Sequence, residues 1–269
     1  MTTKPSQKRK GEERKPRGGS RETFKALAIA ILLALTIRSF VIEPFKIPSG
    51  SMIPTLLVGD YLVVNKFEYG LRLPITGQLL APIGEPNRGD VVVFRFPDDP
   101  RQDYIKRIIG LPGDRIEIID GRLWINGQIV DRIPEGEFEF MDYHRGIRRR
   151  VARFREINPE GREYTIIHER PGARRNRGPW LVPAGEYFMM GDNRDNSRDS
   201  REWRDKFVRA DQIKGRAFLI HWSWVVAPGP VSERGFLVDL FYTLYRVVTF
   251  QVEEVRWSRI GKRVNGVAD

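Results

Sequence analysis

Hydrophobic and polar positions follow two different patterns along this chain of 269 residues. Near the start, residues 24–42 read FKALAIAILLALTIRSFVI, an almost continuous apolar run of 19 residues. A helix needs roughly 20 apolar residues to cross the hydrocarbon core of a bilayer. Lys25 and Arg38 lie near the two ends of the run, where long basic side chains reach the polar interface. We therefore predict one N-terminal transmembrane helix over 24–42.

After Pro48 the apolar residues come in short runs separated by turn residues, a pattern typical of strands. Asp120-Gly121 lies between two of the runs and is typical of a type I′ hairpin turn, and Asn126-Gly127 predicts a further turn. No long helical pattern separates the runs, which disfavours a parallel α/β fold. We predict a mainly β fold with strands at 60–67, 90–96, 104–109, 115–119, 122–125, 164–167, 186–190 and 216–222.

Composition subdivides this β region. Residues 131–183 are crowded with Arg, Glu, Gly and Pro, and they are expected to form a subdomain inserted into a β core made of 43–130 and 184–225. Within the final segment, 226–269, the apolar stretch 236–250 is interrupted by an aspartate and an arginine. That stretch is too broken for a second membrane span and suits an interfacial or docking helix.

Basic charge is concentrated at the N-terminus. The net charge is +11, and the first 25 residues carry nine Lys/Arg against three Asp/Glu. Basic residues before an apolar span favour retention in the cytoplasm, so residues 1–23 are predicted to be a cytoplasmic tail, with the bulk of the chain on the other side of the membrane. Nucleic-acid binding is the competing interpretation, but it favours basic residues interleaved with aromatics on a folded face. Between Lys4 and Lys25 the only aromatic residue is Phe24, at the very end, and we expect no nucleic-acid partner.

A cleavable signal peptide and a buried soluble helix are the alternatives for the apolar run. Its uninterrupted part, 26–37, is 12 residues long, which suits a signal peptide. The residues that follow, EPFKIP at 43–48, lack a small-x-small cleavage site. We therefore favour a signal anchor that stays in place.

The chain has no cysteine and only three histidines, His144, His168 and His221. The lack of cysteine excludes disulfides, thiolate nucleophiles and cysteine-type zinc sites. No two histidines have the close spacing of a helical zinc motif. We expect neither a metal nor another cofactor.

Ser51 lies in the segment PSGSMIPT at 48–55, nine residues after Ile42, so it is within about 30 Å of the end of the apolar run. A serine hydroxyl needs a base within hydrogen-bond reach to act as a nucleophile. Lys106, which shares a strand face with Tyr104 and Ile108, is the leading candidate because burial lowers the pKa of a lysine. Two ordinary interpretations stay open: Ser51 in a structural turn, and Lys106 pointing to water.

Four ordered segments resemble the conserved boxes of bacterial type I signal peptidases. They read SGSMIPTL at 49–56 with GD at 59–60, RGDVVVF at 88–94, YIKR at 104–107 with GLPGD at 110–114, and GDNRDNSRDSR at 191–201. Their order and content match together across the chain. The resemblance implies a mainly β catalytic domain and a membrane-bound Ser/Lys endopeptidase that removes signal peptides from exported preproteins.

Roles for individual residues follow from the same resemblance. It implies that Ser51 is the nucleophile, that Lys106 is the general base, and that Ser197 hydrogen-bonds and orients the lysine. The oxyanion would be held by the Ser51 N–H and the Ser49 hydroxyl. Residues of a shallow apolar cleft for small-x-small sites would be Phe45, Ile47, Pro48, Met52, Leu56, Tyr104 and Ile105, and residues that brace the active-site loop would be Asp192, Arg194, Asp199 and Arg201.

The expected partners are preprotein signal peptides, the lipid bilayer and, nearby, the protein export machinery. The expected location is the plasma (inner) membrane, with a single span and the catalytic domain on the extracytoplasmic (periplasmic) face. A membrane-tethered basic protein that binds nucleic acid or anionic lipid is the alternative from another class. A Ser/Lys protease with a different task, such as self-cleavage, is a third.

Overall fold

The computed structural model describes residues 20–40, 42–72, 79–142, 145–169, 176–226 and 252–264. The chain separates into two compact units, residues 1–38 and 39–269. Each unit is described by itself.

Helix α1 (Ser20–Phe40) contains most of the apolar run. The apolar side chains described on it are exposed, among them Phe24 at 73%, Ile29 at 66% and Leu32 at 66%. No helix in the described ranges combines the length and hydropathy that a membrane span requires. The transmembrane helix stays a prediction, and residues 1–19 of the predicted tail lie outside the described residues.

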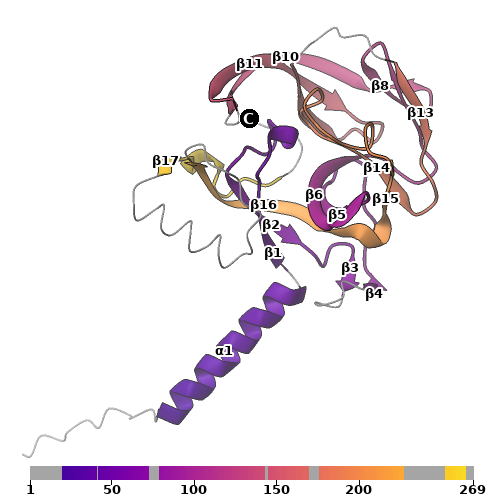
Figure 1. Ribbon diagram of the computed structural model, residues 1–269. Coiled ribbons are helices and arrows are strands. Elements are labelled where there is room, and N and C mark those ends of the chain that lie inside the picture. Colours follow the sequence, from indigo (N-terminus) through magenta and orange to yellow (C-terminus); the bar gives the residue numbers. More distant parts are fainter. Residues whose placement is uncertain are drawn as a thin grey trace, which may run out of the picture. The chain divides into compact units, whose positions relative to one another are not determined.

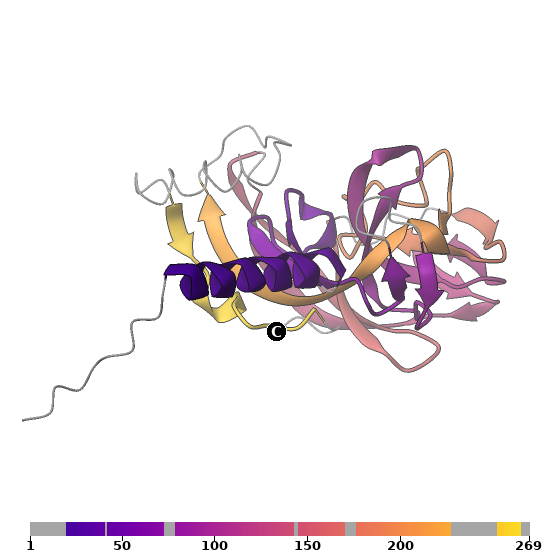
Figure 2. The same ribbon diagram turned by 90° about the horizontal axis from the view of Figure 1, so that it is seen from below.

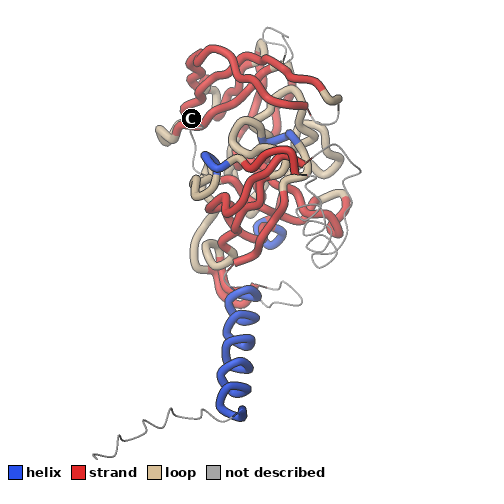
Figure 3. The backbone as a smooth tube through the Cα atoms, turned by 90° about the vertical axis from the view of Figure 1, so that its left-hand side faces the viewer, coloured by secondary structure: helices blue, strands red, loops and turns tan. Residues whose placement is uncertain are grey.

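The second unit is built mainly from strands, as the tube in Figure 3 shows. Its largest sheet has the strand order β1-β2-β16-β5-β6-β14-β15, and β17 pairs with β16 beside this path. The described pairings between these strands are all antiparallel. The bounds are β1 (Ile42–Lys46), β2 (Asp60–Asn65), β5 (Val91–Phe96), β6 (Asp99–Gly110), β14 (Glu186–Met190), β15 (Val208–Arg209), β16 (Ile213–Val226) and β17 (Val252–Val255).

Three smaller sheets complete the described strands (Figure 1). One has the order β13-β7-β8-β9, one has the order β10-β11-β12, and a third is the hairpin β3-β4. The bounds are β3 (Gly70–Arg72), β4 (Leu79–Pro82), β7 (Arg115–Ile119), β8 (Arg122–Ile125), β9 (Gln128–Ile129), β10 (Asp131–Asp142), β11 (Ile147–Ile157), β12 (Glu163–His168) and β13 (Arg177–Leu181). Single 3₁₀ turns occur at η1 (Gly50–Met52), η2 (Ala210–Gln212) and η3 (Trp257–Arg259).

The mainly β prediction is therefore confirmed by the strands themselves. Both predicted tight turns have the expected geometry, because Asp120 and Gly121 have φ of 51° and 72°, and Asn126 and Gly127 have φ of 53° and 79°. Positive φ at both central residues is the signature of a type I′ turn.

The predicted insertion, 131–183, does not form a sheet system of its own. Strands β10 to β12 make a separate sheet, but β13 pairs with β7, which belongs to the predicted β core. Residues 39–269 also cluster as one compact unit. The composition shift at 131 coincides with a change of sheet, and the inserted subdomain over 131–183 stays a prediction.

The C-terminal segment contributes a strand to the large sheet. Strand β17 pairs with the end of β16, with Trp224 opposite Val255, and Figure 2 shows the two strands side by side. The predicted interfacial helix at 236–250 lies outside the described residues.

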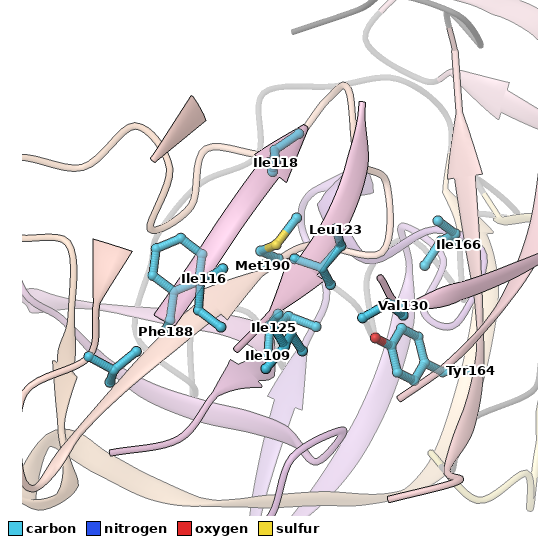
Figure 4. Packing of buried hydrophobic residues seen from close by; sticks show 11 residues of the cluster. Ile109, Ile116, Ile118, Leu123, Ile125, Val130, Tyr164, Ile166, Phe188 and Met190 are labelled. Atoms are coloured by element: carbon cyan, nitrogen blue, oxygen red, sulfur yellow. The ribbon is translucent and has the colours of Figure 1, made fainter. Parts of the chain in front are cut away.

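One hydrophobic cluster joins β6, β7, β8, β12 and β14 (Figure 4). Phe188 of β14 is fully buried, and its ring lies 4.9 Å from that of Trp180 and 6.1 Å from that of Phe207. This cluster fixes β14, the strand that leads into residues 191–201. Packing of this cluster thus fixes the position of the segment 191–201, the last of the four segments, because it begins directly after β14.

Replacing Phe188 by alanine should lower the free energy of unfolding by about 3–5 kcal/mol, because a buried ring is lost and a cavity is left. Denaturant unfolding of the purified protein measures this. Phe218→Ala is the control, since Phe218 is 44% exposed and should cost less than about 1 kcal/mol. Equal losses of unfolding free energy in the two variants would show that this cluster stabilises the fold no more than an exposed ring does.

Candidate active site

Ser51 occupies the short turn η1 between β1 and β2, and its side chain is 8% exposed. The flanking Met52 and Leu56 are fully buried and anchor the turn in the core. Asn193 holds the turn from the opposite side: its N–H donates to the Ser51 carbonyl at 3.1 Å and its Nδ2 to the Gly50 carbonyl at 3.3 Å. The serine is therefore fixed by packing on one side and by backbone hydrogen bonds on the other.

Lys106 lies in β6, opposite Val92 of β5, and is 4% exposed. Its Nζ donates to Ser51 Oγ at 2.8 Å and to the Ile105 carbonyl at 2.9 Å. It also lies 5.3 Å from the centre of the Tyr104 ring, as the predicted shared strand face requires. The structure thus brings together the two residues singled out from the sequence, and Lys106 does not point to water.

Burial lowers the pKa of Lys106 from its ordinary 10.5 to about 8. The carboxylates of Asp199 and Asp192 oppose this shift, and Arg201 adds to it. A pKa near 8 leaves roughly a tenth of the lysine neutral at pH 7, against less than a thousandth for an unperturbed lysine. The site can therefore supply a neutral amine within reach of a hydroxyl.

Donors for a developing oxyanion lie beside the same hydroxyl. Ser49 precedes η1 at its N-cap without making a cap hydrogen bond, and its Oγ lies 3.4 Å from Ser51 Oγ. The Ser51 N–H lies in the first turn of η1, where helical N–H groups lack partners within the helix. Both groups predicted for the oxyanion are therefore close to the nucleophile.

Three ion pairs brace the loop that follows β14. Arg107 and Asp192 are each about 1% exposed and pair at 2.7 Å, and Thr55 Oγ1 donates to the same carboxylate at 2.5 Å. Arg201 pairs with Asp199 at 2.7 Å.

The third pair joins Arg194 to Glu156 of β11, with Nη1 and Oε1 at 2.8 Å. Burial penalises each of these charges, but the paired carboxylate raises the pKa of Arg194, and Arg201 lowers that of Asp199. All four residues predicted to brace the loop are paired, two of them with partners that the sequence did not indicate.

Ser197 is buried but does not make the predicted hydrogen bond to Lys106. Its Oγ has no hydrogen bond of standard geometry among the described residues, although the hydroxyl is close enough to Asp199 to help lower the pKa of that carboxyl. A Cβ placed on Gly191 would lie 2.3 Å from Ser197 Oγ and 2.4 Å from the Ser51 carbonyl oxygen. Gly191 therefore lies between Ser197 and η1, the turn that carries Ser51, and is in close contact with both.

The predicted cleft divides into surface and core residues. Ile47, Met52 and Leu56 are at most 2% exposed and belong to the hydrophobic core beneath the site. These three side chains would shape such a cleft from below, and their role in substrate binding stays a prediction. The members that reach the surface are Phe45, Pro48, Tyr104 and Ile105.

The sequence reasoning missed several residues that hold the site. Arg107 follows Lys106 directly, and Gly191 and Asn193 lie within the last box, but their contacts depend on how distant segments meet. Two arginines of the C-terminal segment were also missed. Arg259 donates to the Thr55 carbonyl at 2.9 Å and Arg256 to the Val58 carbonyl at 2.7 Å.

Both of these arginines also face the buried carboxylate of Asp60, at 2.6 Å from Arg259 and 3.4 Å from Arg256. Residues 55–60, which follow Ser51, are thus hydrogen-bonded and ion-paired to Arg256 and Arg259 of the C-terminal segment. No signal within the final segment indicated this contact.

Comparison with known proteins agrees with this geometry. The family model described as "Signal peptidase, peptidase S26" matches residues 20–222. The chain belongs to this family. The resemblance carried by the four boxes is confirmed, and the protein is a hydrolase of the signal peptidase I type.

Curated relatives match over most of their length. A signal peptidase I of Pseudomonas aeruginosa is 43% identical over 220 residues, covering 76% of this chain and 72% of the relative. One of Rickettsia typhi is 38% identical over 264 residues, covering 92% of this chain and 95% of the relative. One of Buchnera aphidicola is 36% identical over 242 residues, covering 75% and 74%.

Within the described ranges, no group of three or more His, Cys, Asp or Glu side chains has the arrangement of a metal site. The acidic residues nearest the dyad, Asp192 and Asp199, are engaged by arginines.

Replacing Gly191 by alanine should reduce kcat by about a hundredfold, because displacing Ser51 by even 1 Å has effects of this size. Gly191 does not have positive φ, so the effect comes from the contacts with Ser197 and Ser51 rather than from the backbone. Cleavage of a precursor peptide gives kcat, and circular dichroism reports whether the fold is retained. A folded variant with kcat within twofold of the parent would contradict the tight packing around Gly191.

Proposed function

We propose that this chain is a membrane-tethered serine endopeptidase that removes N-terminal signal peptides from exported preproteins. The observation that carries the proposal is the 2.8 Å contact between Lys106 Nζ and Ser51 Oγ in a buried setting. A lysine with a lowered pKa beside a serine hydroxyl is an activated nucleophile pair. Membership in peptidase family S26 supports the same reaction.

In the first step neutral Lys106 accepts the proton of Ser51 as Oγ attacks the scissile carbonyl. The carbonyl oxygen becomes an oxyanion, and the Ser51 N–H and the Ser49 hydroxyl stabilise it. Lys106 then gives the proton to the departing amine of the mature protein, and an ester of Ser51 with the signal peptide remains. Water, deprotonated by Lys106, attacks this ester and releases the signal peptide and free Ser51.

Ser197 and the ion pairs act as positioning groups in this scheme. In this scheme the buried Ser197 orients Lys106, and among the described residues its hydroxyl makes no hydrogen bond to the lysine before substrate binds. Arg107, Arg194 and Arg201 engage the nearby carboxylates, so none of these acids forms an ion pair with Lys106 among the described residues. The ammonium therefore loses its proton more readily.

The substrate class follows from the surface beside the dyad. Phe45, Pro48, Tyr104 and Ile105 offer an apolar surface, and Phe45 and Ile105 pack on the cluster that contains the buried Ile47, Met52 and Leu56. Such a surface accepts small side chains of an extended chain, in agreement with small-x-small sites.

Membrane tethering rests on the apolar run. The described apolar side chains of α1 are exposed, so hydrocarbon would be a favourable environment for them. We propose a single span in the plasma (inner) membrane with the N-terminus in the cytoplasm and the catalytic unit on the extracytoplasmic face, near the export machinery. Ser51 would then act where signal peptides leave the bilayer.

Ser51→Ala and Lys106→Ala should each reduce cleavage of a preprotein by at least about 10⁴-fold, since members of a nucleophile pair act as a unit. Gel analysis of a preprotein with a small-x-small site measures this. Lys66→Ala is the matched control, because Lys66 follows β2, pairs with Glu43 and should leave the rate unchanged. Retained cleavage in a folded Lys106→Ala protein would rule out the dyad.

Activity should rise with pH through a midpoint near pH 8 and then level off. The reason is that Lys106 acts as a base only when neutral, and its pKa is about 8. A profile of kcat/KM between pH 6 and about pH 10 with a single ascending limb checks this. An ascending limb centred near pH 10 would mean that the lysine is not perturbed, and activity falling from pH 6 to 8 would mean that another group acts as the base.

A further inference from the structure

The structure contains a cavity next to η1, the turn that carries Ser51. It is a cavity of about 360 Å³ between the residues that follow η1, strand β10 and strand β17. Ile53 and Leu57 contribute apolar walls on one side, and residues 139–141 of β10 face them. None of the surface residues of the predicted cleft lines this cavity, so it is a separate feature of the described chain.

The cavity begins within reach of the reacting bond. Ile53 follows Ser51 by two residues, which puts their Cα atoms within about 7.6 Å of each other. A polypeptide whose carbonyl carbon is bound at Ser51 Oγ spans a similar distance with two of its own residues. A substrate chain that leaves the dyad toward Ile53 therefore enters the cavity directly.

One wall of the cavity is formed by β10, the edge strand of its sheet, together with Arg148 of β11. The order β10-β11-β12 leaves β10 without a neighbour on its outer side in the described chain. Pro134 and the irregularity between Pro134 and Glu137 break the first half of this edge, as proteins do to prevent unwanted pairing. From Glu137 to Asp142 the register with β11 is regular, so alternate N–H and C=O groups of this stretch point outward.

The walls of the cavity suit an extended peptide of mixed sequence. Phe138 and Phe140 pack with Ile53 in one hydrophobic cluster. Arg148 and Glu254 add one charge of each sign to the lining. Arg256 closes the side near Val58, held there by the Val58 carbonyl at 2.7 Å and by Ser223 Oγ at 2.8 Å.

From these observations we propose that the cavity and the Glu137–Asp142 edge bind the first residues of the mature protein, the part of the precursor after the cut. This segment adds as a strand to β10, so backbone hydrogen bonds give affinity with little demand on sequence. The inference rests on the proposed function and extends it, because it assigns a role to β10 in holding the leaving half of the substrate. Release of the mature protein then requires loss of these hydrogen bonds.

The test compares two precursor peptides with the full-length protein in detergent. The long peptide continues about eight residues past the cut, enough for one strand, and the short one ends about two residues past it. We expect kcat/KM to be roughly tenfold higher for the long peptide, the size expected for one or two net hydrogen bonds. Met141→Trp, which fills the cavity, should abolish this preference and leave cleavage of the short peptide unchanged.

Ile133→Trp is the matched control, since Ile133 is a 41% exposed residue of β10 outside the cavity lining. It should keep the preference for the long peptide. A second series uses the unaltered protein and long peptides that carry a single N-methyl group at successive positions after the cut. Strand addition predicts that kcat/KM falls at every second position, because only alternate N–H groups point to β10.

Equal kcat/KM for the long and short peptides, or an N-methyl series without alternation, would overturn this inference while the proposed function stands. A preference that survives Met141→Trp would also overturn it. If neither peptide is cleaved by a folded protein, the proposed function itself fails, and the two failures are thereby distinguished.

Discussion

The site depends on one unfavourable arrangement, a lysine ammonium buried against a serine hydroxyl without a carboxylate in contact. Burial disfavours the charged form of Lys106 and brings its pKa to about 8. The unfolded chain, with a pKa near 10.5, binds more protons than the folded chain between these two values, so stability rises with pH across that window. Below about pH 8 both states are protonated and the full destabilisation is present. The fold tolerates this strain because the rest of the core is well packed.

Carboxylates near the lysine would cancel the effect if they were free. Asp192 and Asp199 both act on Lys106 and raise its pKa, but each is engaged by an arginine, Arg107 and Arg201 respectively. These pairs are buried, and removing one partner would leave an unpaired charge beside the site. The arginines of these segments therefore do two things: they fix the loop after β14, and they weaken the stabilisation of the Lys106 ammonium by the carboxylates.

Sequence reasoning reached the strands and the tight turns because each leaves a local mark: Tyr104, Ile105, Ile108 and Ile109 mark β6, and Asp120-Gly121 marks a hairpin. Local pattern left Ser51 and Lys106 open, and only the resemblance of the four segments singled them out, after which the structure places the two side chains in contact. Sequence reasoning could not reach contacts made by residues far apart along the chain. Three such contacts join segments that lie 38 to 204 residues apart in the sequence. They are the hydrogen bonds from Asn193 to Gly50, from Arg194 to Glu156 and from Arg259 to Thr55. The burial of Ile47, Met52 and Leu56 was missed for a related reason, since an apolar residue near a cleft looks the same in sequence whether it lines the surface or lies beneath it.

The most direct test of the account is the ionisation of Lys106 itself, observed without substrate. Lysine side chains labelled with ¹³C at Cε report their protonation by NMR, and Lys106→Met identifies the resonance. The account predicts that the Lys106 signal titrates with a pKa near 8 in the folded protein. A Lys106 signal that titrates at the ordinary lysine pKa of about 10.4 would contradict it, because the lysine would then be solvated or ion-paired and unable to serve as the base.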